Sequence, residues 1–168
     1  MSEPAPFAYL LLSKLEEQIE RTDHLISLVP PDKLEWKPAT DFLRLCEVLG
    51  HLLECLAGFC ATLYAVNPER LAHFIRLREQ PVNHCCGIDE ARARVREYAE
   101  HIREGFDLLD DAALARRVST VFEPAGEPLM TIMLGNLEHL INHKHQLFSY
   151  LKLLGVEAGT RDLYKPRL

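Results

Sequence analysis

Three histidines carry the side chains best suited to hold a metal ion: His51 in one amphipathic segment and, further along, His139 and His143 in another. Residues four apart lie on one face of an α-helix, about 6 Å apart along its axis, so both imidazoles of His139-Leu-Ile-Asn-His143 can point at one spot. A third imidazole from a neighbouring helix completes a His₃ set, the usual construction of a catalytic zinc site with a position open for water. We therefore predict a divalent metal site at His51, His139 and His143.

The setting of these histidines supports a metal over a cluster of charged rings. Burying several imidazoliums together is costly, whereas neutral imidazoles around a cation avoid that cost. A ligating histidine also needs an acceptor for its other ring nitrogen. Glu47 lies one turn before His51 and Glu54 three residues after it, and two further polar residues flank the pair, Glu138 and Asn142.

Other sites built from similar residues fail on spacing. A ferritin-like di-iron bundle needs Glu-x-x-His on two helices, and the sequence contains no such motif. A zincin needs His-Glu-x-x-His, and a Ser/His/Asp hydrolase needs a strand before its nucleophile. We interpret the remaining five histidines as hydrogen-bonded, half-buried residues, not ligands: His24, His73, His84, His101 and His145.

The composition is that of an ordinary globular protein, and we predict a single domain over residues 1–168. The formal net charge is −6, without a Lys/Arg-rich patch, which argues against a nucleic-acid partner. The chain has no run of about 18 apolar residues and no basic segment before an apolar stretch at its start. We therefore expect no membrane association and a cytoplasmic location.

The five cysteines are an odd number without the pattern of a small disulfide scaffold, which indicates a reducing compartment. Cys46, Cys55 and Cys60 lie in an apolar helical segment and are interpreted as small core residues. The pair Cys85-Cys86 follows His84. Adjacent cysteines do not readily close a normal disulfide, and these three neighbours cannot comfortably wrap one tetrahedral metal. We favour a loop without a site over a second metal site.

Four segments repeat apolar residues with the period of an amphipathic helix, at about 7–29, 41–66, 89–109 and 127–154. They predict an all-α fold, a four-helix bundle. About 20 residues separate the second helix from the third, with a short helix at 69–79, which is too many for a tight hairpin. We therefore expect a crossover and up-down-down-up connectivity. The second and fourth helices then run antiparallel, which lets the three histidines meet.

The run from His139 to Gly155, HLINHKHQLFSYLKLLG, resembles the C-terminal signature of the DinB-like (YfiT-like) four-helix-bundle proteins. That signature is His-x-x-x-His, a basic-Gly-Gln triplet and an apolar stretch ending in Gly. The segments Trp36-Lys-Pro38 and Glu47-Val-Leu-Gly-His51-Leu are similar to the family's Trp-x-Pro connector and second-helix histidine. The resemblance spans essentially the whole chain. One departure, Lys144-His145-Gln146 in place of Arg-Gly-Gln, predicts different packing after the second ligand.

The resemblance implies metal ligation by His51, His139 and His143, a zinc or nickel ion with open water positions, and frequent homodimers. It also implies thiol-dependent S-transfer or isomerisation with low-molecular-weight thiols, since a metal-bound thiol is deprotonated at neutral pH. We predict a metal-dependent transferase that joins a small thiol to a small-molecule substrate, with Glu47 or a water as proton acceptor. The alternative is a non-catalytic protein that binds or senses a metal or small ligand.

Two interpretations of Trp36 stay open. It lies either on the rim of a pocket above the metal, lined by apolar residues of the second and fourth helices, or as a plug at the end of the bundle. A metal with a purely structural role is the least attractive hypothesis. A closed site normally takes four protein ligands, and a bundle of this length does not need a metal ion to be stable.

Overall fold

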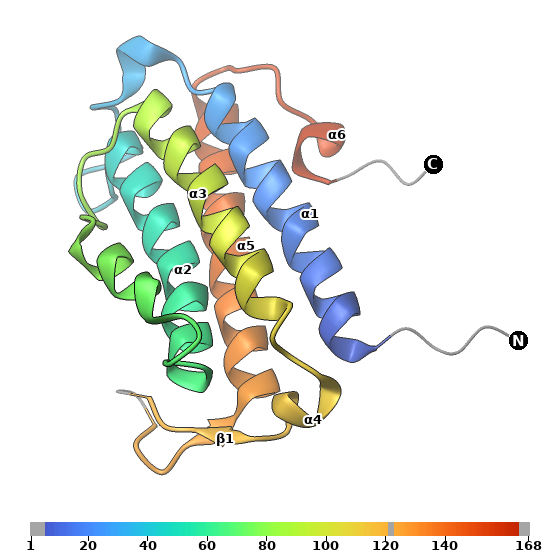
Figure 1. The fold of residues 1–168 in the computed structure, drawn as a ribbon. Helices are drawn as coiled ribbons and strands as arrows, with labels where there is room; N and C mark the ends of the chain where they lie inside the picture. Colours follow the sequence, from blue (N-terminus) through green and yellow to red (C-terminus); the bar gives the residue numbers. More distant parts are fainter. Residues whose placement is uncertain (1–5, 121–122, 165–168) are drawn as a thin grey trace, which may run out of the picture.

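Helices dominate the computed structural model, which describes residues 6–120 and 123–164 (Figure 1). The predicted single domain extends over residues 1–5, 121–122 and 165–168, which lie outside this description. The four long helices are α1 (Phe7–Ser27), α2 (Leu45–Val66), α3 (Ile88–Phe106) and α5 (Leu129–Leu153). The all-α fold that the apolar period predicts is confirmed.

Shorter elements join the long helices. They are the 3₁₀ segments η1 (Pro31–Lys33) and η2 (Ala72–Glu79), the short helices α4 (Asp111–Leu114) and α6 (Thr160–Leu163), and the strands β1 (Arg117–Val118) and β2 (Glu127–Pro128). The two strands pair antiparallel, with Arg117 opposite Pro128. This small ribbon closes the lower end of the bundle in Figure 1.

Contacts near the helix ends establish the connectivity. The Cys86 amide, just before α3, donates to the Cys46 carbonyl at the start of α2. Near the other end of both helices, a Cβ on Gly105 would lie 2.7 Å from Leu63 Cδ1, so the missing side chain allows close packing. Helices α2 and α3 are therefore parallel, and the chain crosses over between them through η2.

The other two helices run against this pair. Arg92 of α3 forms an ion pair with Asp23 late in α1, and Arg103 forms one with Glu16 earlier in α1. Asn136, early in α5, donates to Thr62 late in α2. Thus α1 and α5 ascend in Figure 1 while α2 and α3 descend, which is the up-down-down-up order.

Helices α2 and α5 begin later than the apolar period suggests, and α3 begins one residue earlier. Helix α2 starts at Leu45 instead of 41, because the Glu47 carboxylate accepts a hydrogen bond from the Arg44 amide at 2.8 Å and caps the first turn there. Helix α3 starts at Ile88, so Asp89 lies inside its first turn and does not cap it. Helix α5 starts at Leu129 because Glu127–Pro128 pairs with β1.

Helix α2 is the centre of the bundle. Its apolar stripe, including Leu49, Leu52 and Leu56, is fully buried, and each such leucine contributes about 1.5–3 kcal/mol relative to an exposed one. By length and composition α2 could cross a membrane, with a mean hydropathy of 1.5, but 61% of that window is buried inside the protein. Packing against α3, α5 and η2 accounts for this composition.

Lys144 is an unusual member of the core. Its side chain is 2% exposed, and its ammonium donates to Gln18 Oε1 at 2.7 Å and to the Leu163 carbonyl at 3.0 Å. It thereby ties α5 to α1 and α6. Burial lowers the pKa of Lys144 to about 8. Lys144 stands where the signature of the DinB-like proteins has arginine. It is therefore a buried amine with two hydrogen-bond acceptors, directly after His143.

This pKa predicts how stability depends on pH. Because the folded pKa of about 8 lies below the pKa of about 10.4 for an unfolded lysine, the unfolded chain binds more protons between these values. The free energy of unfolding of the wild type, relative to Lys144→Met, should therefore rise from pH 8 to 10, by at most about 1.4 kcal/mol per pH unit. Urea denaturation of both proteins across this range measures it. A constant difference would show that Lys144 does not titrate as described.

Candidate metal centre

The structure brings His51, His139 and His143 together between α2 and α5. One ring nitrogen from each lies within 4.8 Å of the others. The rings stand nearly edge to face, with centroids 4.1 Å apart for His51 and His143 and 4.8 Å apart for His139 and His143. His51 and His143 are half-buried, whereas His139 is exposed. The group therefore opens toward solvent on one side.

The closest approach in this cluster is between two ring nitrogens. His51 Nε2 and His143 Nε2 are 3.0 Å apart. For a neutral ring, the partners of the opposite nitrogen, Nδ1, determine whether Nε2 carries the proton. Those partners decide whether the contact is an ordinary hydrogen bond.

The protonation of His143 is fixed by a chain of hydrogen bonds along α5. The Leu43 carbonyl can only accept, so the Tyr150 hydroxyl, 3.0 Å away, donates to it. Tyr150 then accepts from the Gln146 amide nitrogen at 3.3 Å, which turns Gln146 Oε1 toward His143 Nδ1 at 2.8 Å. His143 Nδ1 therefore carries the proton, and its Nε2 presents a lone pair.

His51 is held in the same tautomer. Its Nδ1 lies 2.6 Å from Asn83 Oδ1 and 3.0 Å from a carboxylate oxygen of Glu54. An ionised carboxylate only accepts hydrogen bonds, so Nδ1 of His51 carries the proton. In its neutral form, His51 then turns its Nε2 lone pair toward the Nε2 lone pair of His143, whereas a protonated His51 donates a hydrogen bond to it.

Two such lone pairs 3.0 Å apart repel each other unless a proton or a metal ion lies between them. Two imidazole nitrogens that bind one ion at 2.0–2.1 Å are about 2.8–3.4 Å apart for right-angle to tetrahedral geometry. Burial, together with the neighbouring His51 and His139, lowers the pKa of His143 and favours its neutral, ligating form. The donor set therefore fits a divalent cation. Asn83, Glu54 and Gln146 are the acceptors that such ligands need on the opposite nitrogen.

The third histidine has a sulfur neighbour. Cys55 Sγ lies 3.8 Å from His139 Nδ1. Burial, aided by the charge of Glu54, raises the pKa of the Cys55 thiol to about 12. Cys55 therefore stays a protonated thiol at neutral pH, and the imidazole remains the ligand at this position.

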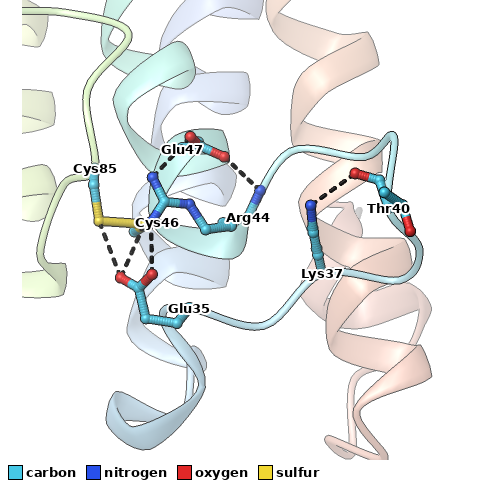
Figure 2. A network of polar contacts seen from close by, with 7 residues as sticks. All are labelled: Glu35, Lys37, Thr40, Arg44, Cys46, Glu47 and Cys85. Atoms are coloured by element: carbon cyan, nitrogen blue, oxygen red, sulfur yellow. Dashed lines mark hydrogen bonds and ion pairs between the residues drawn. A yellow bond between two sulfur atoms is a disulfide. The ribbon is translucent and has the colours of Figure 1, made fainter.

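Glu47, the carboxylate predicted to accept a proton, is occupied elsewhere (Figure 2). It accepts hydrogen bonds from both the side chain and the backbone amide of Arg44, at 2.9 and 2.8 Å. These bonds lower the pKa of Glu47 to about 2, which makes it a weak base. Glu54 is the carboxylate that touches a histidine of the cluster.

Trp36 packs beside the hydrogen-bond chain and not against the histidines. Its ring meets Tyr150 edge to face, with centroids 5.5 Å apart. A hollow of about 510 Å³ does lie against α2, but neither Trp36 nor any of the three histidines lines it. Its apolar lining comes mainly from Ala57, Cys60, Ala61, Tyr64, Phe74 and Leu77. This hollow is therefore not the predicted pocket above the metal.

The structure corrects the interpretation of two cysteines: Cys46 and Cys85 form a disulfide (Figure 2). Adjacency of Cys85 and Cys86 argues only against a bond between those two. The sequence does not reveal that the crossover loop folds back onto the first turn of α2. There the Cα atoms of Cys46 and Cys85 are 4.6 Å apart. Cys55, Cys60 and Cys86 are free and buried.

The same loop supplies Asn83, which the sequence analysis does not identify. Asn83 has a φ of 55°, a left-handed conformation that asparagine tolerates better than most residues. The backbone amide of Asn83 donates to the Gly50 carbonyl at 3.0 Å. A Cβ on Gly50 would lie 2.0 Å from the His84 carbonyl oxygen. A glycine inside a long apolar helix is the available sign of this close approach.

Of the five remaining histidines, four have a hydrogen-bond partner as predicted, but only His24 and His84 are half-buried. His24, His84 and His101 have partners outside the cluster, at 2.8, 2.9 and 2.8 Å. His73 contacts Glu104 at 3.0 Å. In the part of the chain that the structure describes, these two with His101 form one of three further groups with ligand atoms within 4.8 Å, beside Glu35 with Cys46 and Cys85, and His84 with Cys86 and Glu90. Because His73 and Glu104 already pair as donor and acceptor, their group has no facing lone pairs of the kind found at His51.

Comparison with known proteins adds two findings. A family model for the DinB superfamily matches residues 14–147. Among solved structures, the chain is similar to a DinB-like protein from Bacillus subtilis, YjoA, with a TM-score of 0.68 and 19% sequence identity, covering 89% of this chain and 94% of that one. This second likeness concerns the fold. No curated protein matches the chain.

Proposed function

The chain belongs to the DinB superfamily, and from that premise we propose that it binds a divalent metal ion through His51, His139 and His143 and acts as a metal-dependent transferase with a low-molecular-weight thiol. The observation that carries the metal proposal is the convergence of three imidazoles, with the Nε2 atoms of His51 and His143 3.0 Å apart and a polar partner on each opposite Nδ1. The family match includes all three histidines, and the acceptors on their Nδ1 atoms pre-set the ligating tautomer of two of them.

Zinc and nickel are the proposed ions, since imidazole ligands suit both. When bound, such an ion supplies Lewis acidity that favours the thiolate form of a thiol beside it. Three protein ligands leave coordination positions for a small molecule, and the exposure of His139 places the open side toward solvent.

Glu54 is the proposed proton acceptor in place of Glu47. Its carboxylate lies against His51 Nδ1 at 3.0 Å and is 41% exposed, so it reaches both the cluster and water. Glu47 is held by Arg44, and its pKa of about 2 leaves it little tendency to take a proton. The thiol, its acceptor substrate and the homodimer implied by the family resemblance stay predictions.

The transferase proposal is tested with protein reconstituted with zinc or nickel. It is incubated with cysteine, glutathione or N-acetylcysteine and with 1-chloro-2,4-dinitrobenzene or styrene oxide, and thioether products are measured by mass spectrometry. We expect metal-dependent product that is lost in His143→Ala and Glu54→Gln but kept in Glu47→Gln. Tight metal and thiol binding without product across the panel would instead support a binding or sensing protein.

A further inference from the structure

The two sulfurs of the disulfide differ in their access to solvent. Cys46 is fully buried in the first turn of α2, whereas Cys85 is exposed on the crossover loop. A small thiolate can therefore reach Cys85 Sγ from outside, while Cys46 Sγ is shielded. Thiol–disulfide exchange depends on which sulfur is accessible, so this asymmetry selects the sulfur that is attacked.

A carboxylate lies against both sulfurs (Figure 2). Glu35 Oε1 is 3.4 Å from Cys85 Sγ and 3.7 Å from Cys46 Sγ. A disulfide has no hydrogen to donate, whereas each thiol of the reduced pair could donate to this oxygen. Arg44 holds Glu35 in place at 2.6 Å. The surroundings therefore accommodate the reduced pair as well as the disulfide.

Cys46 lies at the N-terminal end of a helix, which favours a thiolate, whereas its full burial and Glu35 Oε1, 3.7 Å from its Sγ, disfavour one. Cys46 is the second residue of α2, and helix N-termini and neighbouring arginines lower the energy of a thiolate.

The other three cysteines lie elsewhere. Cys55 and Cys60 lie further along α2. Cys86 lies just before α3, where burial and Glu90 raise the pKa of its thiol and Arg94 lowers it. Burial raises the pKa of Cys55, Cys60 and Cys86 to about 12, so they stay protonated and are poor nucleophiles.

We propose that Cys46–Cys85 is a redox-active disulfide that exchanges with low-molecular-weight thiols, with Cys85 as the attacked sulfur and Cys46 as the leaving thiolate. A thiolate RS⁻ bonds to Cys85 Sγ, the S–S bond breaks, and the electron pair goes to Cys46. A second RS⁻ attacks the mixed disulfide and releases Cys85. In total, two RSH become RSSR, and the protein gains two electrons and two protons. A small disulfide RSSR reverses the sequence.

The redox state of Cys46 and Cys85 affects the histidine cluster, because the crossover loop that carries Cys85 also carries Asn83. Asn83 lies two residues before Cys85 and binds His51 Nδ1 at 2.6 Å. Apart from the disulfide, the amides of Asn83 and Cys86 attach this loop to the carbonyls of Gly50 and Cys46, each at 3.0 Å. Opening the disulfide removes the covalent attachment and loosens Asn83, one of the two acceptors at His51 Nδ1. This coupling rests on the proposed metal centre, whereas the exchange does not.

The exchange is tested on the full chain equilibrated with mixtures of reduced and oxidised glutathione, then trapped with iodoacetamide and mapped by mass spectrometry. We expect Cys46 and Cys85 to become alkylated together as reduced glutathione increases, and Cys46→Ser to carry glutathione at Cys85. Cys60→Ala, which removes a buried free thiol, is the matched control and should behave like the wild type. Failure of the pair to form a disulfide at any ratio, or equal modification of all cysteines in Cys46→Ser, would overturn the proposal.

Hydrogen exchange tests the coupling. The amides of Asn83 and Cys86 should exchange at least about tenfold faster in the reduced protein and in Cys85→Ser than in the oxidised wild type, and zinc affinity should fall by about tenfold. Unchanged amide exchange would overturn the coupling. Faster exchange without zinc binding in either state would contradict the metal proposal instead, and would leave the redox-active disulfide supported.

Discussion

Replacing His143 by alanine should abolish stoichiometric binding of zinc or nickel while leaving the helical content of the bundle unchanged. The substitution removes one of the two nitrogens that face each other at 3.0 Å, so the remaining donors no longer surround one point. We expect affinity to fall by at least about 100-fold, more than the 10–100-fold typical of losing an outer hydrogen-bond partner. His143 is half-buried and lies within α5, where alanine is a strong helix former. Isothermal titration and circular dichroism measure the two quantities.

Two further variants make this result specific. Tyr150→Phe removes the hydroxyl that orients Gln146, leaves all three histidines in place, and should weaken binding by about tenfold. His145→Ala removes an exposed imidazole two residues from His143 on the same helix and should bind metal like the wild type. Equal metal content in the wild type and in a His51→Ala/His143→Ala double variant would show that the ion, if any, binds elsewhere.

The parts of the site that the sequence predicts are those set by local periodicity. An i, i+4 pair within an apolar helix must share a face, and the length of the connection after the second helix indicates a crossover. Together these place His51 on a helix antiparallel to the one that carries His139 and His143, as the structure shows. Neither inference needs knowledge of any loop.

The parts that sequence reasoning misses depend on competition between neighbours and on the path of a loop. Glu47 and Glu54 are both within a turn of His51, and helix geometry alone does not choose between them. Arg44 determines which carboxylate contacts His51, because it binds Glu47 and leaves Glu54 beside the imidazole. Asn83 reaches His51 only because the crossover loop folds back over Gly50, and spacing in the sequence carries no trace of that path.

Gly50→Ala should destabilise the protein, although alanine ordinarily stabilises the middle of a helix by about 0.5–1 kcal/mol relative to glycine. The added Cβ would lie 2.0 Å from the His84 carbonyl oxygen and 2.8 Å from the His84 nitrogen. These are backbone atoms, so no side-chain rotation relieves the overlap and the loop must move. We expect a net loss of about 2–4 kcal/mol in the free energy of unfolding. Urea denaturation measures it.

The same substitution should also weaken metal binding, although Gly50 touches no ion. Displacing the loop breaks the bond from the Asn83 amide to the Gly50 carbonyl and withdraws Asn83 Oδ1 from His51, which corresponds to a loss of about tenfold in affinity. Gly135→Ala in α5 is the matched control. A Cβ there meets nothing within 4 Å, so this variant should be stabilised by up to about 1 kcal/mol and should bind metal normally. If both variants gained stability equally, the loop would not lie against α2 as described. A destabilised Gly50→Ala with full metal affinity would show that His51 keeps its orientation through Glu54 alone.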